Sequence, residues 1–290
     1  MATGPVFVRY FQPVLAALDH LGGSGRPREV TERVAEMVQA TPADLLATTK
    51  SGTARFENQV AWARFYLAKA GLIDSSSRGV WALSEQGAAR LAMTHEEAVA
   101  IFRAVHQTLT TEKVAVEEEQ DEDPPSPAAA SPSSGAGVPA TWKSELLTRL
   151  QSISPAAFEQ FCQRLLRESG FQSVEVTGKS GDGGIDGIGI LEVNALVSFK
   201  VLFQCKRFQG AVGSGQVRDF RGAMSGRTDK GIIITTGTFT SDARREAVRD
   251  GVPPIELVDS EKLVSLCEQA MLGVKEFRTL VVDEAYFEHL

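Results

Sequence analysis

Apolar and polar positions alternate with two different periods along the first 91 residues of the chain. Apolar residues spaced three and four apart indicate amphipathic helices, and short apolar runs around a polar turn indicate a hairpin. The pattern predicts helices at residues 6–21, 28–40 and 56–70, hairpin strands at 72–74 and 80–83, and a further helix at 84–91. Gly71 suits the end of the third helix, because glycine readily adopts the conformation of a helix C-cap.

Three helices followed by a hairpin is the order of a winged helix-turn-helix domain. In such domains the third helix enters the major groove of DNA and the wing lies on the backbone. We therefore expect the third helix to expose side chains that suit phosphates or base edges, namely Arg55, Asn58, Gln59 and Arg64. Arg78 is expected at the wing tip. Taken alone, each of these residues is as typical of an ordinary solvated surface as of a DNA contact. The order of helices and strands is therefore stronger evidence for a DNA-binding domain than any single side chain.

The apolar pattern stops at residues 111–140, which read TEKVAVEEEQDEDPPSPAAASPSSGAGVPA. A segment without a periodic apolar face buries too little surface to offset the entropy lost on ordering. The composition predicts a disordered acidic linker rich in Pro, Ser and Ala. We therefore expect a winged-helix domain at residues 1–110 and a second domain at 141–290.

Helices and strands alternate after the linker. Helices are predicted at 142–150, 154–169, 216–224, 241–248 and 261–272, and strands at 171–177, 187–193, 197–206, 230–236 and 255–258. This order predicts an α/β (α+β) domain with a mixed central sheet flanked by helices. The whole chain is therefore expected to have a two-domain architecture.

Charge is unevenly distributed between these segments. The net charge of −7 by itself disfavours a DNA partner, because DNA affinity depends largely on Lys and Arg at phosphates. However, residues 1–110, 111–140 and 141–290 carry net charges of +1, −6 and −2. Within residues 177–249, 11 basic side chains exceed 7 acidic ones. Most of the acidity therefore lies in the linker, and DNA remains a compatible partner.

Several other classes of protein are disfavoured. No apolar run approaches the roughly 18 residues of a membrane span, and the start of the chain lacks the pattern of a signal peptide, so we expect a cytoplasmic protein without a membrane partner. The cysteines Cys162, Cys205 and Cys267 form no CxxC pair, which indicates reduced thiols. The four histidines are scattered along the chain, which disfavours a histidine-based metal site.

Candidate catalytic residues stand at the ends of two predicted strands. Asp186 ends the run GKSGDGGIDG just before one strand, and FQCK ends the next strand with Gln204 and Lys206 on one face and Cys205 on the other. If the strands are adjacent, Asp186 lies beside that pair. Phosphodiester hydrolysis needs oxygen ligands for Mg²⁺ and a cation near the attacking water. Asp186 and Gln204 supply the oxygens and Lys206 supplies the cation.

The pattern D-x17-Q-x-K, followed by Gln216 and GIIITTGTFT, resembles the Mrr family of restriction endonucleases in the PD-(D/E)xK nuclease superfamily. The first domain resembles the winged-helix domain of that family through NQVAWARFYLAKAGL and SRGVWALSEQG. The resemblance implies cleavage of double-stranded DNA, in known members often methylated, with Mg²⁺ or Mn²⁺. It also implies that Asp186, Gln204 and Lys206 are catalytic, and that Glu159 in FEQFCQRLL joins Asp186 and Gln204 as a metal ligand.

The sequence departs from the superfamily pattern at two positions. Gln204 stands where an acid is usual, which weakens the hold on a metal ion and predicts millimolar rather than micromolar demand. Ile185 stands where proline is usual. Asp182 competes with Asp186, because either carboxylate of this glycine-rich run can simply cap a turn, but Asp186 lies at the strand edge. Taken alone, Glu159 is more typical of a solvated helix residue.

The role of Thr235 and Thr236 also stays open at this stage, since they end an apolar strand and suit either the core or a phosphate or water ligand. Restriction of foreign or methylated DNA by a type IV enzyme is the expected function. The alternatives are a catalytically silent DNA-binding or regulatory protein of the same fold, and a repair nuclease. Intact Asp186, Gln204 and Lys206 favour an enzyme. Cutting both strands usually needs two active sites, which predicts a homodimer or larger homo-oligomer.

Overall fold

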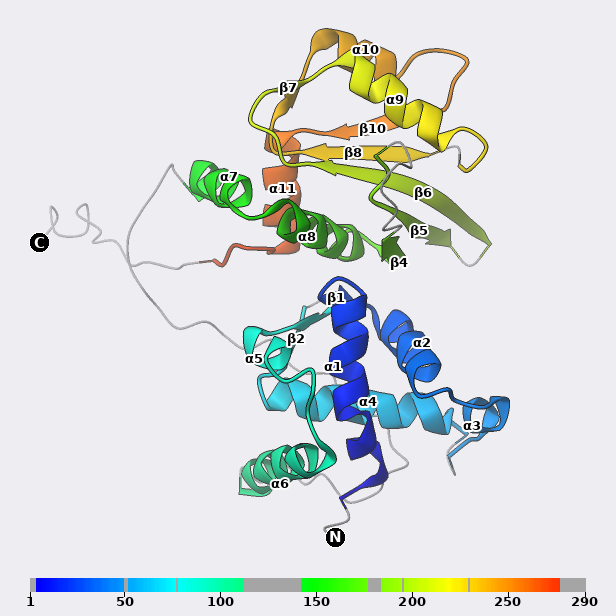
Figure 1. Ribbon diagram of the computed structural model, residues 1–290, viewed down its shortest axis with the longest axis vertical. Helices are drawn as coiled ribbons and strands as arrows, with labels where there is room; N and C mark the ends of the chain where they lie inside the picture. The colour runs from blue at the N-terminus through cyan, green and yellow to red at the C-terminus, as the bar shows by residue number, and fades with distance from the viewer. Residues whose placement is uncertain are drawn as a thin grey trace, which may run out of the picture.

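The computed structural model describes residues 4–49, 52–76, 78–111, 142–176, 184–194, 196–228 and 230–276. Beyond Thr111, the predicted linker lies outside the described residues. The chain forms two domains, one mainly helical and one built around a sheet (Figure 1). This confirms the predicted two-domain α/β fold. Among the described residues, no helix is long and apolar enough to cross a membrane.

The N-terminal domain has the element order of a winged helix. Its helices are η1 (Val6–Tyr10), α1 (Phe11–His20), α2 (Pro27–Met37), α3 (Pro42–Leu46), α4 (Arg55–Lys69), α5 (Glu85–Ala88) and α6 (His95–Thr111). Its strands are β1 (Ser24–Gly25), β2 (Ile73–Ser75) and β3 (Trp81–Leu83), which pair antiparallel in the order β1-β3-β2. The predicted hairpin is therefore the β2–β3 wing, and α4 is the helix that corresponds to the recognition helix.

Two helices of this domain were not predicted. The five-residue α3 buries no side chain, so it has no apolar stripe to reveal it. For α6 a local signal exists in Thr94 and Glu97, since the Thr94 N–H donates to the Glu97 carboxylate at 2.7 Å and the Glu97 N–H donates to the Thr94 hydroxyl at 3.3 Å. This is a capping box, which marks a helix start in the sequence.

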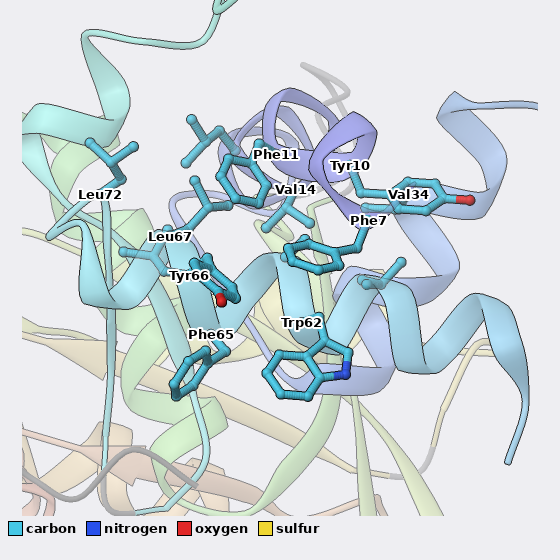
Figure 2. Packing of buried hydrophobic residues seen from close by; sticks show 14 of the residues in the cluster. Phe7, Tyr10, Phe11, Val14, Val34, Trp62, Phe65, Tyr66, Leu67 and Leu72 are labelled. Carbon is cyan, nitrogen blue, oxygen red and sulfur yellow. The ribbon is translucent and has the colours of Figure 1, made fainter. Parts of the chain in front are cut away.

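An aromatic cluster fills the core of the N-terminal domain (Figure 2). The Phe7 ring lies 5.2 Å from the Tyr66 ring and 6.2 Å from the Trp62 ring, measured between centroids. The ring of Phe102 from α6 lies 5.0 Å from that of Tyr66. Because η1, α1, α2, β2 and α6 all contact α4, this helix is enclosed by its own domain along most of its length.

The C-terminal domain contains a five-stranded mixed sheet in the order β10-β8-β6-β5-β4. The strands are β4 (Phe171–Val176), β5 (Gly187–Asn194), β6 (Val197–Lys206), β8 (Gly231–Thr235) and β10 (Ile255–Val258). β6, β8 and β10 run parallel, whereas β4 and β5 are antiparallel to their neighbours. The predicted mixed sheet is confirmed. A two-stranded parallel pair, β7 (Ala211–Val212) and β9 (Thr238–Phe239), was too short to predict.

Helices cover both faces of this sheet (Figure 1). The elements α7 (Trp142–Ser152), α8 (Pro155–Glu168) and α11 (Ser260–Ala270) pack on one face, and α9 (Ser214–Met224) and α10 (Ser241–Ala247) pack on the other. Along β6, Phe203 faces α8 and Leu202 faces α9. Because side chains alternate along a strand, Cys205 faces α8, whereas Gln204 and Lys206 face the side of α9.

Candidate active site

The candidate residues of the sheet meet where β5 begins and β6 ends. The two strands are adjacent and antiparallel, with Gly187 paired to Phe203. One residue before β5, the Asp186 N–H donates to the Phe203 carbonyl at 3.0 Å. The strand adjacency on which the sequence prediction depended is therefore present, and Asp186 lies beside Gln204.

The Asp186 carboxylate is anchored to the backbone of β6. Its Oδ2 accepts a hydrogen bond from the Cys205 N–H at 2.5 Å. A carboxylate that accepts a backbone N–H is held in one orientation without neutralising its charge. Asp186 is thus a fixed anionic oxygen donor at the edge of the sheet where β5 begins and β6 ends.

The Gln204 side chain is buried, with 7% of its surface exposed, and its Nε2 donates to the Gly184 carbonyl. Gly184 has a φ of +81°, and a Cβ there would lie 2.2 Å from the Gln204 Nε2. Glycine is therefore required both for the left-handed backbone and for the approach of the amide. The glycine run in the sequence signalled the first requirement, but the second was missed.

The Gln204 Oε1 is buried and accepts no hydrogen bond among the described residues. Because Nε2 must face the Gly184 carbonyl, the orientation of the amide leaves its oxygen as the atom without a donor. An unsatisfied buried acceptor costs about 1–3 kcal/mol. A cation bound beside Asp186 would satisfy this oxygen, so the residues present fit a metal ion.

Lys206 is half-buried at the end of β6, and Thr235 at the end of β8 and the following Thr236 hold the backbone of this region. The Thr235 hydroxyl donates to the Lys206 carbonyl at 2.8 Å and accepts from the Gly237 N–H at 3.1 Å. The Thr236 hydroxyl donates to the Phe208 carbonyl at 3.0 Å and accepts from the Phe208 N–H at 2.9 Å. Both threonines are buried, so of the two roles left open the structure supports the structural one.

Glu159 lies on α8 and is half-buried beside the buried Phe158. It therefore approaches from the α8 face, opposite the face of Gln204 and Lys206, and its described contacts include no hydrogen bond or ion pair with either of them. Burial raises the pKa of the Cys205 thiol well above its usual value, the neighbouring Cys162 raises it further, and the carboxylates of Asp186 and Glu159 add to the shift. Cys205 thus lies close to both acids.

The donors at this end of the sheet are two carboxylates and one amide oxygen. Such hard oxygen donors suit Mg²⁺ or Mn²⁺. In the described part of the chain, no group of three or more His, Cys, Asp or Glu side chains is placed to hold a metal ion. Any site here therefore needs Gln204 as well. Asp182 lies outside the described residues, so the structure does not compare it with Asp186 as a metal ligand.

Of the predicted DNA-binding residues on α4, only Arg55 and Gln59 are accessible. Arg55 is exposed and donates to the Thr48 carbonyl at 3.1 Å, and Gln59 is half-buried and accepts from Arg9 at 3.4 Å. Both lie toward the N-terminal end of the helix, which is the end that contacts base edges in helix-turn-helix proteins.

The expectation that α4 exposes Asn58 and Arg64 is wrong. Asn58 is 2% exposed and Arg64 is 7% exposed, because α4 is packed on several sides. The Arg64 guanidinium lies 5.3 Å from the centre of the Trp81 ring, and burial lowers its pKa to about 10. Both residues line the floor of a groove of about 720 Å³ beside α2, whose lining also includes Thr31.

Arg78 lies at the tip of the β2–β3 wing, as the sequence predicts, but there it contacts the C-terminal domain. Its guanidinium donates to the Glu168 carbonyl at 2.8 Å and to the Gln269 carbonyl at 2.8 Å, both in the C-terminal domain. These partners are backbone atoms far away in the chain. No side-chain motif could have identified them.

Comparison with known proteins matches both domains. The family model described as "Mrr N-terminal domain" matches residues 7–93, and the model described as "Restriction endonuclease" matches residues 150–267. The chain is 31% identical over 307 residues to the type IV methyl-directed restriction enzyme EcoKMrr of Escherichia coli strain K12, which covers 99% of this chain and 100% of that enzyme.

Among solved structures, MspJI restriction endonuclease in complex with a 27-mer oligonucleotide aligns with a TM-score of 0.37 and 21% identity, over 68% of this chain and 49% of that chain. The DNA modification-dependent restriction endonuclease AspBHI aligns with a TM-score of 0.39 and 18% identity, over 70% of this chain and 56% of that chain.

Proposed function

Since the chain belongs to the Mrr family of restriction endonucleases, we propose that it cuts double-stranded DNA at the Asp186–Gln204–Lys206 site with Mg²⁺. Membership of this family makes the protein a type IV restriction-type DNA endonuclease. Enzymes of this family bind DNA and generally use a divalent metal ion. The choice of Mg²⁺, with Mn²⁺ as a substitute, and of these particular residues is the proposal.

One observation carries the assignment of the site. The Gln204 Oε1 is buried without a hydrogen-bond donor among the described residues, beside a carboxylate that Cys205 holds in place. A buried polar atom without a hydrogen-bond partner requires an explanation, and we propose a bound cation as the explanation here. Glu159 is proposed as a third ligand on its match to the helical acidic residue of the family, and α8 brings it to the face of β6 opposite Gln204.

Each residue then has a role that follows from its chemistry. Bound Mg²⁺ would supply charge stabilisation at phosphorus and a more acidic water. Asp186 and Gln204 present oxygens whose positions are fixed by β6 and by Gly184. Lys206 points along the same face of β6 as Gln204, so its ammonium group suits the scissile phosphate or the attacking water. The Thr235 bond to its carbonyl keeps the strand end in place.

DNA recognition is proposed to begin at the exposed end of α4. Arg55 suits a phosphate and Gln59 a base edge, since both lie on the winged helix and remain accessible. The relative EcoKMrr is described as methyl-directed, and we propose the same preference for methylated DNA here. Two sites are needed for a double-strand break, so we further propose a homodimer or larger homo-oligomer.

The test compares site variants with matched controls. Asp186→Ala and Lys206→Ala should abolish nicking of methylated supercoiled plasmid in Mg²⁺ while DNA binding and the melting curve stay close to wild type. Asp250→Ala is the control for the first, because Asp250 is exposed and precedes β10, at the opposite sheet end. Lys200→Ala is the control for the second, because Lys200 is exposed on the same face of β6, roughly 20 Å from Lys206.

Both controls should cut at the wild-type rate, and EDTA should stop every variant. Unmethylated plasmid, tested in parallel, should be cut more slowly. Cutting by Asp186→Ala at the wild-type rate would refute the site assignment and move the metal role to Asp182. Equal cutting of both plasmids would refute the methylation preference alone.

A further inference from the structure

A buried ion pair joins the two domains. Arg167 on α8 is fully buried, and Glu29 on α2 is 6% exposed. The Arg167 Nε donates to Glu29 Oε2 at 3.0 Å, and its Nη2 donates to Glu29 Oε1 at 3.2 Å. These residues are 138 positions apart in the sequence, so the pair exists only because the domains are docked.

The surroundings of this pair satisfy its remaining atoms. The Arg167 Nη1 donates to the Ser24 hydroxyl at 3.2 Å and its Nη2 to the Val174 carbonyl at 2.8 Å. The Glu29 Oε1 accepts from the Val174 N–H at 2.8 Å, and its Oε2 from the Arg26 N–H at 2.8 Å. A buried ion pair is tolerated when its hydrogen bonds are complete in this way, and it becomes unfavourable when one partner is removed.

Two arginines of the N-terminal domain bind backbone carbonyls of the catalytic domain, three of them in the last turns of α8 and α11 and one at the start of β4. Arg26 donates to the Phe171 carbonyl at 2.6 Å and to the Arg167 carbonyl at 2.7 Å. As described above, Arg78 donates to carbonyls at the ends of α8 and α11. The last carbonyls of a helix lack intrahelical donors and carry partial negative charge, so cations are stabilised there.

The docked face is polar. The apolar cluster of residues 7–109 and the two apolar clusters of residues 146–272 share no member, so no common hydrophobic core joins the described parts of the two domains. A cavity of about 360 Å³ opens between α2 and the β4–β6 sheet edge, lined on both sides by charged residues that include Glu32 and Glu192. Polar interfaces between domains are typical of contacts that form reversibly, since the separated charges are readily hydrated.

We propose that the face carrying Arg26 and Arg78 is a binding surface for the DNA backbone, and that the catalytic domain covers it in this closed arrangement. The inference rests on the proposed function, because it takes DNA as the ligand. Phosphate oxygens are charged acceptors, and arginine binds them more strongly than neutral carbonyls. Arg78 lies on the wing, the part of a winged helix that contacts the backbone. DNA and the helix ends of the catalytic domain therefore compete for the same guanidinium groups.

If DNA binds only to open molecules, in which the domains are undocked, the apparent DNA affinity is the intrinsic affinity multiplied by the fraction of molecules that are open. Weakening the ion pair from the catalytic side should therefore raise DNA affinity without adding a DNA contact. Arg167→Gln does this and leaves the wing untouched. Arg149→Gln is the matched control, since Arg149 is exposed on α7 and pairs only with Glu145 of its own helix among the described residues.

The experiment uses the full chain without metal, so that no cutting occurs. Small-angle scattering should show a larger radius of gyration for Arg167→Gln. Anisotropy with a fluorescein-labelled duplex should show at least about tenfold tighter binding. Adding Arg78→Ala should cancel the gain in affinity but not the expansion. Glu29→Gln breaks the same pair from the other domain and should reproduce both changes, which covers the case in which Arg167→Gln folds poorly.

Expansion without tighter DNA binding would overturn the proposed competition and leave the docked face with a structural role. If both Arg167→Gln and Glu29→Gln stay compact and bind DNA as the wild type does, the claim that the two domains dock reversibly would be wrong. Neither result depends on nuclease activity. Failure of the proposed function would instead appear as the absence of Mg²⁺-dependent cutting by the wild-type protein, which this binding assay does not measure.

Discussion

Gly184→Ala is the perturbation that tests most directly how the structure positions Gln204. The backbone at Gly184 has a φ of +81°, where alanine is strained by about 1–2 kcal/mol. In addition, the new Cβ would lie 2.2 Å from the Gln204 Nε2, so the amide must move away and lose its hydrogen bond to the Gly184 carbonyl. That loss contributes about 1 kcal/mol more.

A second glycine of the same domain separates these two effects. Gly226 has a φ of +71°, and a Cβ there meets no atom within 4 Å. Gly226→Ala should therefore show the backbone strain alone, about 1–2 kcal/mol. The difference of about 1 kcal/mol predicts that Gly184→Ala melts roughly 2–4 °C below Gly226→Ala.

The nuclease assay should separate the variants further. In a Mg²⁺ titration with nicked plasmid as the readout, Gly226→Ala should require the same Mg²⁺ concentration as wild type. Gly184→Ala should need a higher concentration, because Gln204 no longer presents its oxygen beside Asp186. Equal melting temperatures for the two variants, together with an unchanged Mg²⁺ requirement for Gly184→Ala, would refute the proposed positioning of Gln204.

Two further predictions concern buried polar groups. Burial lowers the pKa of Arg64 to about 10, so the unfolded state binds the proton of this guanidinium more tightly than the folded state does. The charged side chain therefore destabilises the folded protein at every pH below about 10, and the free energy of unfolding rises as the pH passes from 10 toward 12.5. Arg64→Met should therefore raise the free energy of unfolding at pH 7 by about 1–2 kcal/mol in a urea titration. Arg55→Met is the control, because Arg55 is exposed, and a lower free energy of unfolding for Arg64→Met would contradict the prediction. Burial raises the pKa of Cys205, and raises that of Cys267 to about 12, so both thiols stay protonated at pH 8. Iodoacetamide at pH 8 should label them at least about a hundredfold more slowly than a free cysteine until the protein is denatured, and rapid labelling of the native protein would show that they are accessible thiolates.

The sequence by itself determined the elements that depend on local patterns. The bounds of β6 were predicted correctly because apolar alternation and the polar FQCK end fall within one strand. The start of α8 was predicted because Ser154 caps it, accepting from the Ala157 N–H at 3.1 Å, with Pro155 in the first turn. Asp186 came beside Gln204 because adjacent antiparallel strands bring the start of one to the end of the next.

Only the tertiary structure decided what lies opposite the polar side chains. Helical periodicity shows which face of α4 is apolar, but Asn58 and Arg64 are buried because neighbouring elements also cover the polar side. Arg78 binds backbone carbonyls of the other domain, and every residue has such a carbonyl, so no residue type in the sequence marks the partner. The same holds for Glu29 and Arg167, whose charges would be solvated in either domain alone and are paired only because the domains dock.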